Sequence, residues 1–209
     1  MSRRRTIMQS EKKGGGDLPS EYIKLNYVES AGAAYSRASV MADNDVGVRV
    51  RFKWSQNKGY AAYLLGVYST SQRFSPVFLD NHNATGLFCY TPQLSFSAEP
   101  YASYDNSLHL VEFNIDNRKI KWDGVVVNSV GTISQKEGVL IGIFCRINDG
   151  SDAEHIASAK IYELQFFKND ILISNLVPAQ RQADGAIGFY DTTRHEFIIS
   201  ESSTAFSGG

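Results

Sequence analysis

The sequence has little cysteine, no excess of charge and no long apolar run. Its two cysteines, Cys89 and Cys145, are too few for a disulfide framework, and no Cys/His set has zinc-site spacing. Lys and Arg number 21 against 22 Asp and Glu, so the chain lacks the cationic surplus that displaces counterions from phosphates. Its apolar stretches fall well short of the ~20 residues of a membrane helix. We therefore expect neither a nucleic-acid partner nor a membrane span.

The first residues lack the apolar segment of a secretion signal. Arg3, Arg4 and Arg5 resemble the basic start of a signal peptide, but the polar run TIMQSEKK follows them. We expect residues 1–16 to be a flexible arm that ends in three glycines, and residues 17–209 to be a single domain. The arm is either a solvated tail or a contact with a protein partner in an assembly. Without a signal peptide, the expected location is a virion or the cytoplasm of the producing cell.

Strand-like patterns run through most of the chain, whose 209 residues and 43% hydrophobic content allow a sizeable core. The clearest is VGVRVRFKW at 46–54. Its apolar residues recur at every second position, with Arg49 and Arg51 between them, as in a strand with one buried and one solvated face. A helix would scatter the same residues around its circumference.

Shorter segments of the same kind follow, separated by turn residues. They lie at 60–68, 74–79, 86–90, 107–115, 118–122, 125–130, 138–144, 159–167, 171–177, 186–191 and 196–199. Asp123 and Gly124 stand between two of them, and Asp-Gly is typical of the type I′ turn of a hairpin. No segment has a helical repeat of useful length, which disfavours helical and parallel βαβ folds. The sequence predicts an all-β fold, a two-sheet antiparallel jelly-roll sandwich.

Both ends of the chain resemble one family of modules. The segment LPSEYIKLNYVESAGAAY, from Leu18, resembles the "LP-x-x-Y-x-x-L-x-Y-I-E-S-T-G-T-Q-Y" start of concanavalin A-like (laminin-G-like) modules. SLHLVEFNIDNRKIKWDGVVV resembles a later hairpin of the family, with a His-anchored strand and an Asp-Gly turn. The closing run from Ala157 resembles the family's end through "AKIY", "VP" and "G-x-x-G-x-Y-D". Residues from about 55 to 105 match poorly.

This resemblance implies a curved concanavalin A-like jelly roll. Such lectin-like modules occur in phage tail and structural proteins and in surface proteins of gut bacteria. The matched positions are structural in character, and Gly185 and Gly188 are expected to serve turns. Fold does not by itself carry function.

The same type of jelly roll also houses retaining glucanases, which carry alternating acids on one strand. The nearest segment here runs from Glu112 to Asp116, with Asn114 in place of the central acid. On an extended strand Glu112 and Asp116 have α-carbons about 13 Å apart, whereas a retaining pair of carboxylates lies about 5 Å apart. We therefore expect no catalytic residues, with a degenerate glycoside hydrolase as an alternative. His109 is expected to hydrogen-bond nearby backbone.

Two loops carry the oxygen ligands that a hard cation prefers. They contain Asp80 in one case, and Asp149 and Asp152 in the other. Neither loop has the spacing of an EF-hand, and acids and amides are also ordinary turn formers. We expect no cofactor, with calcium left open at these three residues. The two cysteines stand in apolar strands and are expected to be core residues.

The aromatic residues give the clearest indication of binding, with 11 tyrosines against 2 tryptophans. Tyr101 and Tyr104 stand beside Asp105 and Asn106 in one loop-like segment. Sugar rings stack on aromatic side chains while Asp and Asn bind hydroxyls, so this mixture suits a glycan. The alternative is a loop whose tyrosines fold back to cap the sandwich.

Arg49 and Arg51 offer a second candidate ligand-binding surface on the solvated face of their strand. We hypothesise a non-catalytic binding module for carbohydrate, in a phage-derived tail or surface assembly that it contacts through the N-terminal arm. The alternative from another class is a purely structural virion or appendage subunit that binds only protein.

Overall fold

Strands account for the regular structure in the part of the chain that the computed structural model describes. These residues are 17–43, 45–56, 62–68, 73–79, 87–91, 94–97, 106–116, 118–129, 139–148 and 152–209. They form two sheets and contain no helix, which confirms the all-β, two-sheet prediction. None of them belongs to a helix long and apolar enough to cross a membrane.

The larger sheet contains eleven strands, and its main path runs β11-β10-β9-β4-β15-β16-β17-β18. The bounds on this path are β4 (Val46–Trp54), β9 (His109–Ile115), β10 (Lys119–Trp122), β11 (Val125–Ser129), β15 (Ser158–Lys168), β16 (Ile171–Arg181), β17 (Ile187–Asp191) and β18 (Glu196–Ile198). Three short strands join its side, namely β1 (Tyr22–Lys24) on β16, β2 (Val28–Ala31) on β15, and β19 (Ser207–Gly208) on β2.

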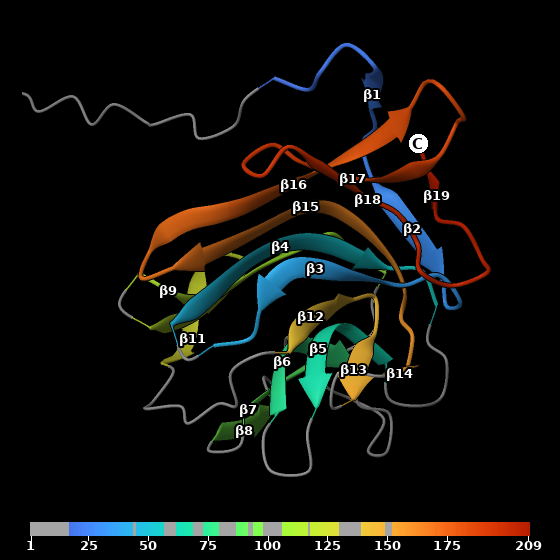
Figure 1. Cartoon of the computed structure of the whole chain (residues 1–209). Coiled ribbons are helices and arrows are strands. Elements are labelled where there is room, and N and C mark those ends of the chain that lie inside the picture. The colour runs from blue at the N-terminus through green and yellow to red at the C-terminus, as the bar shows by residue number, and fades with distance from the viewer. Residues whose placement is uncertain are drawn as a thin grey trace, which may run out of the picture.

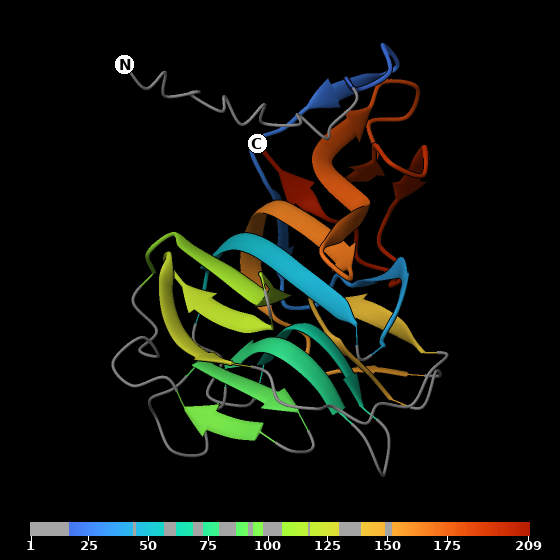
Figure 2. The same ribbon diagram turned by 90° about the vertical axis from the view of Figure 1, so that its left-hand side faces the viewer.

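The smaller sheet contains eight strands, with the main path β14-β13-β5-β6-β7-β8. Its bounds are β3 (Ser36–Met41), β5 (Ala62–Tyr68), β6 (Arg73–Leu79), β7 (Leu87–Thr91), β8 (Leu94–Ser97), β12 (Leu140–Ile143), β13 (Arg146–Asn148) and β14 (Asp152–Glu154). Strand β12 joins β3 to β5, and β13 pairs with β5 in parallel. The larger sheet arches over the smaller one (Figures 1 and 2).

The core lies between the two sheets and follows from the alternation within β4. Val48, Val50 and Phe52 are fully buried, while Arg49 and Arg51 on the opposite face are partly exposed. From the smaller sheet, Leu64, Leu65, Ile141 and Ile143 enter the same cluster. Burying one such side chain contributes about 1.5–3 kcal/mol, so this shared layer is what holds the sheets together.

The hairpin of β10 and β11 has the predicted turn. Asp123 has φ 47° and Gly124 has φ 83°, and positive φ at both central positions defines type I′. His109 Nδ1 lies 2.9 Å from Asp123 Oδ2, and the Leu110 backbone N–H donates to Asp123 Oδ1 at 2.8 Å. The His109 ring also packs on Trp122, with 4.6 Å between ring centroids. The histidine therefore anchors the turn through a carboxylate side chain.

Candidate functional site

Most of the loop predicted to bind a ligand lies outside the described residues. Tyr101, Tyr104 and Asp105 fall there, as do two of the candidate metal ligands, Asp80 and Asp149.

The remaining ligand-binding candidate of that loop, Asn106, and the remaining metal-binding candidate, Asp152, lie in different parts of the structure. Asn106 is exposed just before β9, with φ 56°. Asp152 opens β14, where its backbone pairs with Asn148 on β13, and its side chain lies outside the description. In the ranges that the structure covers, no three His, Cys, Asp or Glu side chains gather as a metal would require.

Arg49 and Arg51 lie together on the outer face of the larger sheet, each beside a carboxylate. Arg49 Nε is 3.7 Å from Glu112 and 3.6 Å from Glu163, and Arg51 Nε is 3.8 Å from Glu163. Partly exposed pairs of this length contribute about 0–1 kcal/mol each. The two arginines thus form part of a cross-strand charge ladder.

Glu112 and Asp116 lie closer together than an extended strand implies. Asp116 follows the end of β9 with φ 55°, and Lys121 Nζ reaches both carboxylates, at 3.6 Å and 3.2 Å. Hydrogen bonds from Lys121 and Lys119 lower the pKa of Asp116. A glycosidase acid needs a raised pKa, so this carboxyl has the opposite environment.

Cys145 is a core residue, as predicted. It is fully buried and its thiol lies 3.8 Å from the Ser36 carbonyl oxygen. Burial raises the pKa of this thiol, which disfavours the reactive thiolate. The side chain of Cys89 lies outside the described residues.

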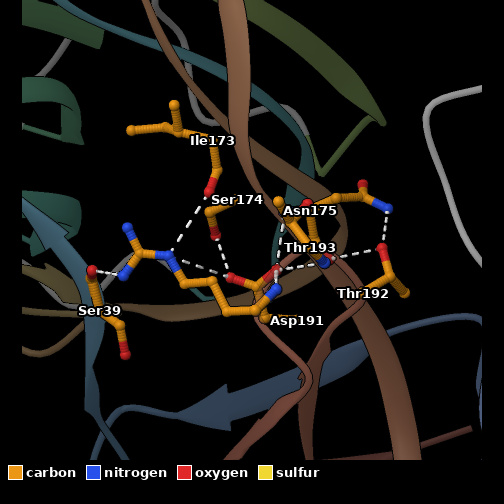
Figure 3. A network of polar contacts seen from close by, with 8 residues as sticks. Ser39, Ile173, Ser174, Asn175, Asp191, Thr192 and Thr193 are labelled. Atoms are coloured by element: carbon orange, nitrogen blue, oxygen red, sulfur yellow. Dashed lines mark hydrogen bonds and ion pairs between the residues drawn. The ribbon is translucent and has the colours of Figure 1, made fainter.

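The Asp of the "G-x-Y-D" motif has a structural role (Figure 3). Asp191 is fully buried and accepts hydrogen bonds from Ser174 Oγ at 2.6 Å and from the Thr193 N–H at 2.8 Å. The N–H groups of Asn175 and Arg194 also donate to it, both at 3.2 Å. These bonds fix the turn after β17 to β16 and satisfy the buried carboxylate.

A cavity of about 480 Å³ lies next to this turn, between β3 and β16. Its charged groups already have partners. Lys168 Nζ is 2.7 Å from Asp43 Oδ2, and Arg194 donates to the Ser39 and Ile173 carbonyl oxygens. A ligand in this cavity would therefore meet charged groups that already bind other groups of the protein.

A different group on the smaller sheet combines aromatic and charged side chains. We call Tyr63, Tyr68, Arg146, Glu154 and His155 the Arg146 cluster; they come from β5, β13, β14 and the residue after β14. On β13, Ile147 is fully buried while its neighbours on either side are partly exposed. Arg146 therefore lies on the outer face of the sheet.

Arg146 is held between rings and a carboxylate. Its Nη2 donates to Glu154 Oε2 at 2.6 Å, and its Nη1 donates to the Tyr63 hydroxyl at 3.3 Å. The guanidinium carbon lies 5.1 Å from the centroid of Tyr63 and 4.6 Å from that of Tyr68, within cation–π range. The Arg146 side chain is 14% exposed and the Glu154 side chain 44%.

The surroundings of Glu154 favour its ionised form. Hydrogen bonds from Arg146, and then from Asn148, lower the pKa of Glu154. The carboxylate is therefore ionised at neutral pH, and its side chain is partly exposed. The Tyr63 ring packs 5.7 Å from the His155 ring, at the buried side of the group.

The backbone around the Arg146 cluster is strained. His155 has φ 52°, and the fully buried Phe144, two residues before Arg146, has φ 61°. The Phe144 N–H donates to Leu64 O, and its carbonyl accepts from the Ala157 N–H, both at 2.7 Å. Positive φ is costly for a bulky residue and persists where neighbouring bonds enforce it, often at functional sites.

Sequence reasoning missed this cluster. Tyr63 and Tyr68 stand in an apolar strand pattern, and Arg146 directly follows the apolar run 138–145. A lone arginine in such a run was the available signal, because it needs partners when it is partly buried. Chemically, the cluster offers a partly exposed ring beside an ionised carboxylate and further polar groups. No protein-family model matches the chain, and no curated protein matches it.

Proposed function

We propose that this chain is a non-catalytic carbohydrate-binding module, and that the Arg146 cluster is its binding surface. The observation that carries the proposal is the Arg146–Glu154 pair at 2.6 Å, held beside the partly exposed ring of Tyr68. A sugar ring stacks its C–H face on an aromatic ring while its hydroxyls donate to a carboxylate. The cluster supplies both at one place, on an outer face.

The environment of the carboxylates supports binding without catalysis. Glu154 and Asp116 both have a lowered pKa, the first from Arg146 and the second from Lys121. Hydrolysis of a glycoside needs a general acid that keeps its proton near neutral pH. A carboxylate that stays ionised instead accepts hydroxyl hydrogen bonds constantly.

We further propose that the sandwich is a concanavalin A-like jelly roll within a phage-derived tail or surface assembly. The resemblance at both ends of the chain supports this assignment. The matched positions share a structural role, because they stabilise turns. His109 holds the Asp123–Gly124 turn, and the buried Asp191 of the closing motif holds the turn after β17. The assembly itself rests on the resemblance alone.

The test is binding of the full chain to an array of neutral and acidic glycans, followed by calorimetry with the glycans found. Tyr68→Ala and Glu154→Gln should each weaken binding about tenfold or more, since a hydrogen bond to a charged group contributes about 1.5–3 kcal/mol. Glu112→Gln is the matched control, a glutamate on the outer face of the other sheet, and should bind normally.

Two outcomes would contradict the proposal. Unchanged binding by both cluster variants would place the ligand elsewhere, and failure to bind any glycan would favour the purely structural subunit. Release of reducing sugar from a bound glycan, abolished by Glu112→Gln, would instead favour the hydrolase alternative.

A further inference from the structure

Two lysines lie directly opposite each other on the outer face of the larger sheet. Lys53 on β4 pairs in register with Lys160 on β15. Both are partly buried, on the face opposite to the buried Phe52 and Trp54. Like charges at directly opposed positions destabilise a sheet, so this pair has a cost in the free protein.

One carboxylate lies beside Lys160, on the strand across β15 from Lys53. Glu29 on β2 pairs in register with Lys160, and its Oε2 lies 3.7 Å from Lys160 Nζ. Ser55 Oγ donates to the other oxygen of Glu29 at 2.7 Å. Nearby Arg51 lies 3.8 Å from Glu163, a carboxylate that it shares with Arg49. The group of Lys53, Lys160 and Glu29 therefore carries a net charge of about +1.

Two tyrosines stand beside the surplus charge. Lys160 Nζ lies 4.1 Å from the centroid of the Tyr27 ring, and the Tyr27 and Tyr162 rings are 5.6 Å apart. A register shift between Ile161 and Glu163 marks a bulge at Tyr162, and bulges redirect side chains. Burial lowers the pKa of Lys160, but contact with Tyr27 and Glu29 outweighs it and the pKa is raised.

We propose that these five residues, the Lys160 patch, bind an acidic sugar residue that carries one negative charge. The members of the patch are Tyr27, Glu29, Lys53, Lys160 and Tyr162. A single anionic group, carboxylate or sulfate ester, neutralises the surplus charge and relieves the repulsion between Lys53 and Lys160. The tyrosine pair offers apolar surface to the sugar ring.

This site lies on the outer face of the larger sheet, whereas the Arg146 cluster lies on the outer face of the smaller one. The two share no residue, so the present inference stands independently of the function proposed above. Its ligand also differs in chemistry, because the Arg146–Glu154 pair is neutral overall, whereas the Lys160 patch carries a surplus positive charge.

The test is calorimetric titration of the full chain with three probes, namely an oligogalacturonate, its neutral methyl ester and a sulfated galactan oligomer. We expect an acidic probe to bind and the methyl ester to bind about tenfold more weakly or not at all, with affinity that falls as salt rises. Comparison of the two acidic probes identifies the anion as carboxylate or sulfate.

Variants separate this site from the rest of the surface. Lys53→Gln and Tyr162→Ala should each weaken the acidic probe severalfold, Lys160→Arg should retain binding, and Glu29→Gln should strengthen it. Lys119→Gln is the matched control, since this lysine lies on the same sheet beside Asp116. Tyr68→Ala, in the Arg146 cluster, should leave the acidic probe unaffected.

Thermal melting without ligand gives an independent readout. Lys53→Gln should leave the melting temperature unchanged or raise it, because it removes a like charge directly opposite Lys160 in the sheet. A lower melting temperature would mean that Lys53 stabilises the sheet and would overturn the proposal. Equal binding of the acid and its methyl ester, or full binding by Lys53→Gln, would overturn it as well.

Discussion

Gly188 lies so close to Ile198 that a β-carbon at Gly188 would overlap the carbonyl oxygen of Ile198. The glycine sits inside β17, without a positive φ, and is buried against β18. The expectation that Gly188 serves a turn is therefore wrong. Its companion Gly185, with φ 71°, does occupy a turn. Gly185 thus adopts the positive φ that the turn requires, whereas Gly188 leaves space for the neighbouring strand β18.

Gly188→Ala should therefore destabilise the protein by about 1–3 kcal/mol, the usual cost of forcing an extra group into packed structure. Gly185→Ala should cost less, about 1–2 kcal/mol from backbone strain alone, because its nearest neighbour lies 3.7 Å from the added carbon. Urea unfolding of both variants measures this order. A harmless Gly188→Ala would mean that β18 does not pack as described.

Gly124→Val tests the turn of the β10–β11 hairpin. A β-carbon at Gly124 meets nothing within 4 Å, so any cost comes from φ 83° and not from crowding. A β-branched residue is strongly strained there, and we expect a loss of more than about 1 kcal/mol. Gly124→Asn is the control and should cost less, because Asn tolerates positive φ. Equal melting temperatures for wild type and Gly124→Val would show that the turn readily changes type.

The alternation of β4 was sufficient to predict that strand with its bounds, because five large apolar residues at period two leave no other reading. Strand β16 continues past its predicted end at Val177. Pro178, which lacks an N–H, lies where pairing with β15 has ended and pairing with β1 begins. Strand β3 was missed because its buried positions include the small Ser36 and Ala38. Small side chains carry little hydrophobic signal.

The candidate site was less predictable than the fold. Arg146 and Glu154 are eight positions apart and meet through the pairing of β13 with β14. Tyr63 reaches them only because β13 also pairs in parallel with β5, far away in the chain. Neither pairing follows from local periodicity, which reports the face of a residue but not its partner strand. Arg49 and Arg51 were predictable as outer-face residues, whereas their carboxylate neighbours required the strand order.

Asp191→Ala should be the most destabilising change in the closing motif. It removes the acceptor of four hydrogen bonds and leaves buried donors on Ser174 and Asn175 unsatisfied. Each unsatisfied donor costs about 1–3 kcal/mol, so we expect a total loss of about 3 kcal/mol or more. Ser174→Ala, which removes one donor and leaves the turn bonds intact, is the control and should cost much less. Similar unfolding midpoints for these two variants would contradict the role given to Asp191.

The turn between β16 and β17 should respond to acid through Asp184. Arg181 Nη2 donates to Asp184 Oδ2 at 2.6 Å and the Ala186 N–H donates to Oδ1 at 3.1 Å. These bonds, that of Arg181 first, lower the pKa of Asp184 to about 2. Because the pKa is lower in the folded state than in the unfolded chain, the stabilisation is present above the ordinary value of 3.8 and is lost as the pH falls toward 2.

Asp184→Asn isolates this charge, since the amide oxygen still accepts from Ala186. The variant should melt below the wild type at about pH 6, and the difference should shrink between about pH 4 and pH 2 as the wild-type carboxyl takes up its proton. Melting curves of both proteins over that range check the prediction, because the difference cancels the titration of all other groups. If the difference in melting temperature stays constant with pH, the variant acts through the shape of the turn. The ion pair with Arg181 would then not be the cause of the stabilisation.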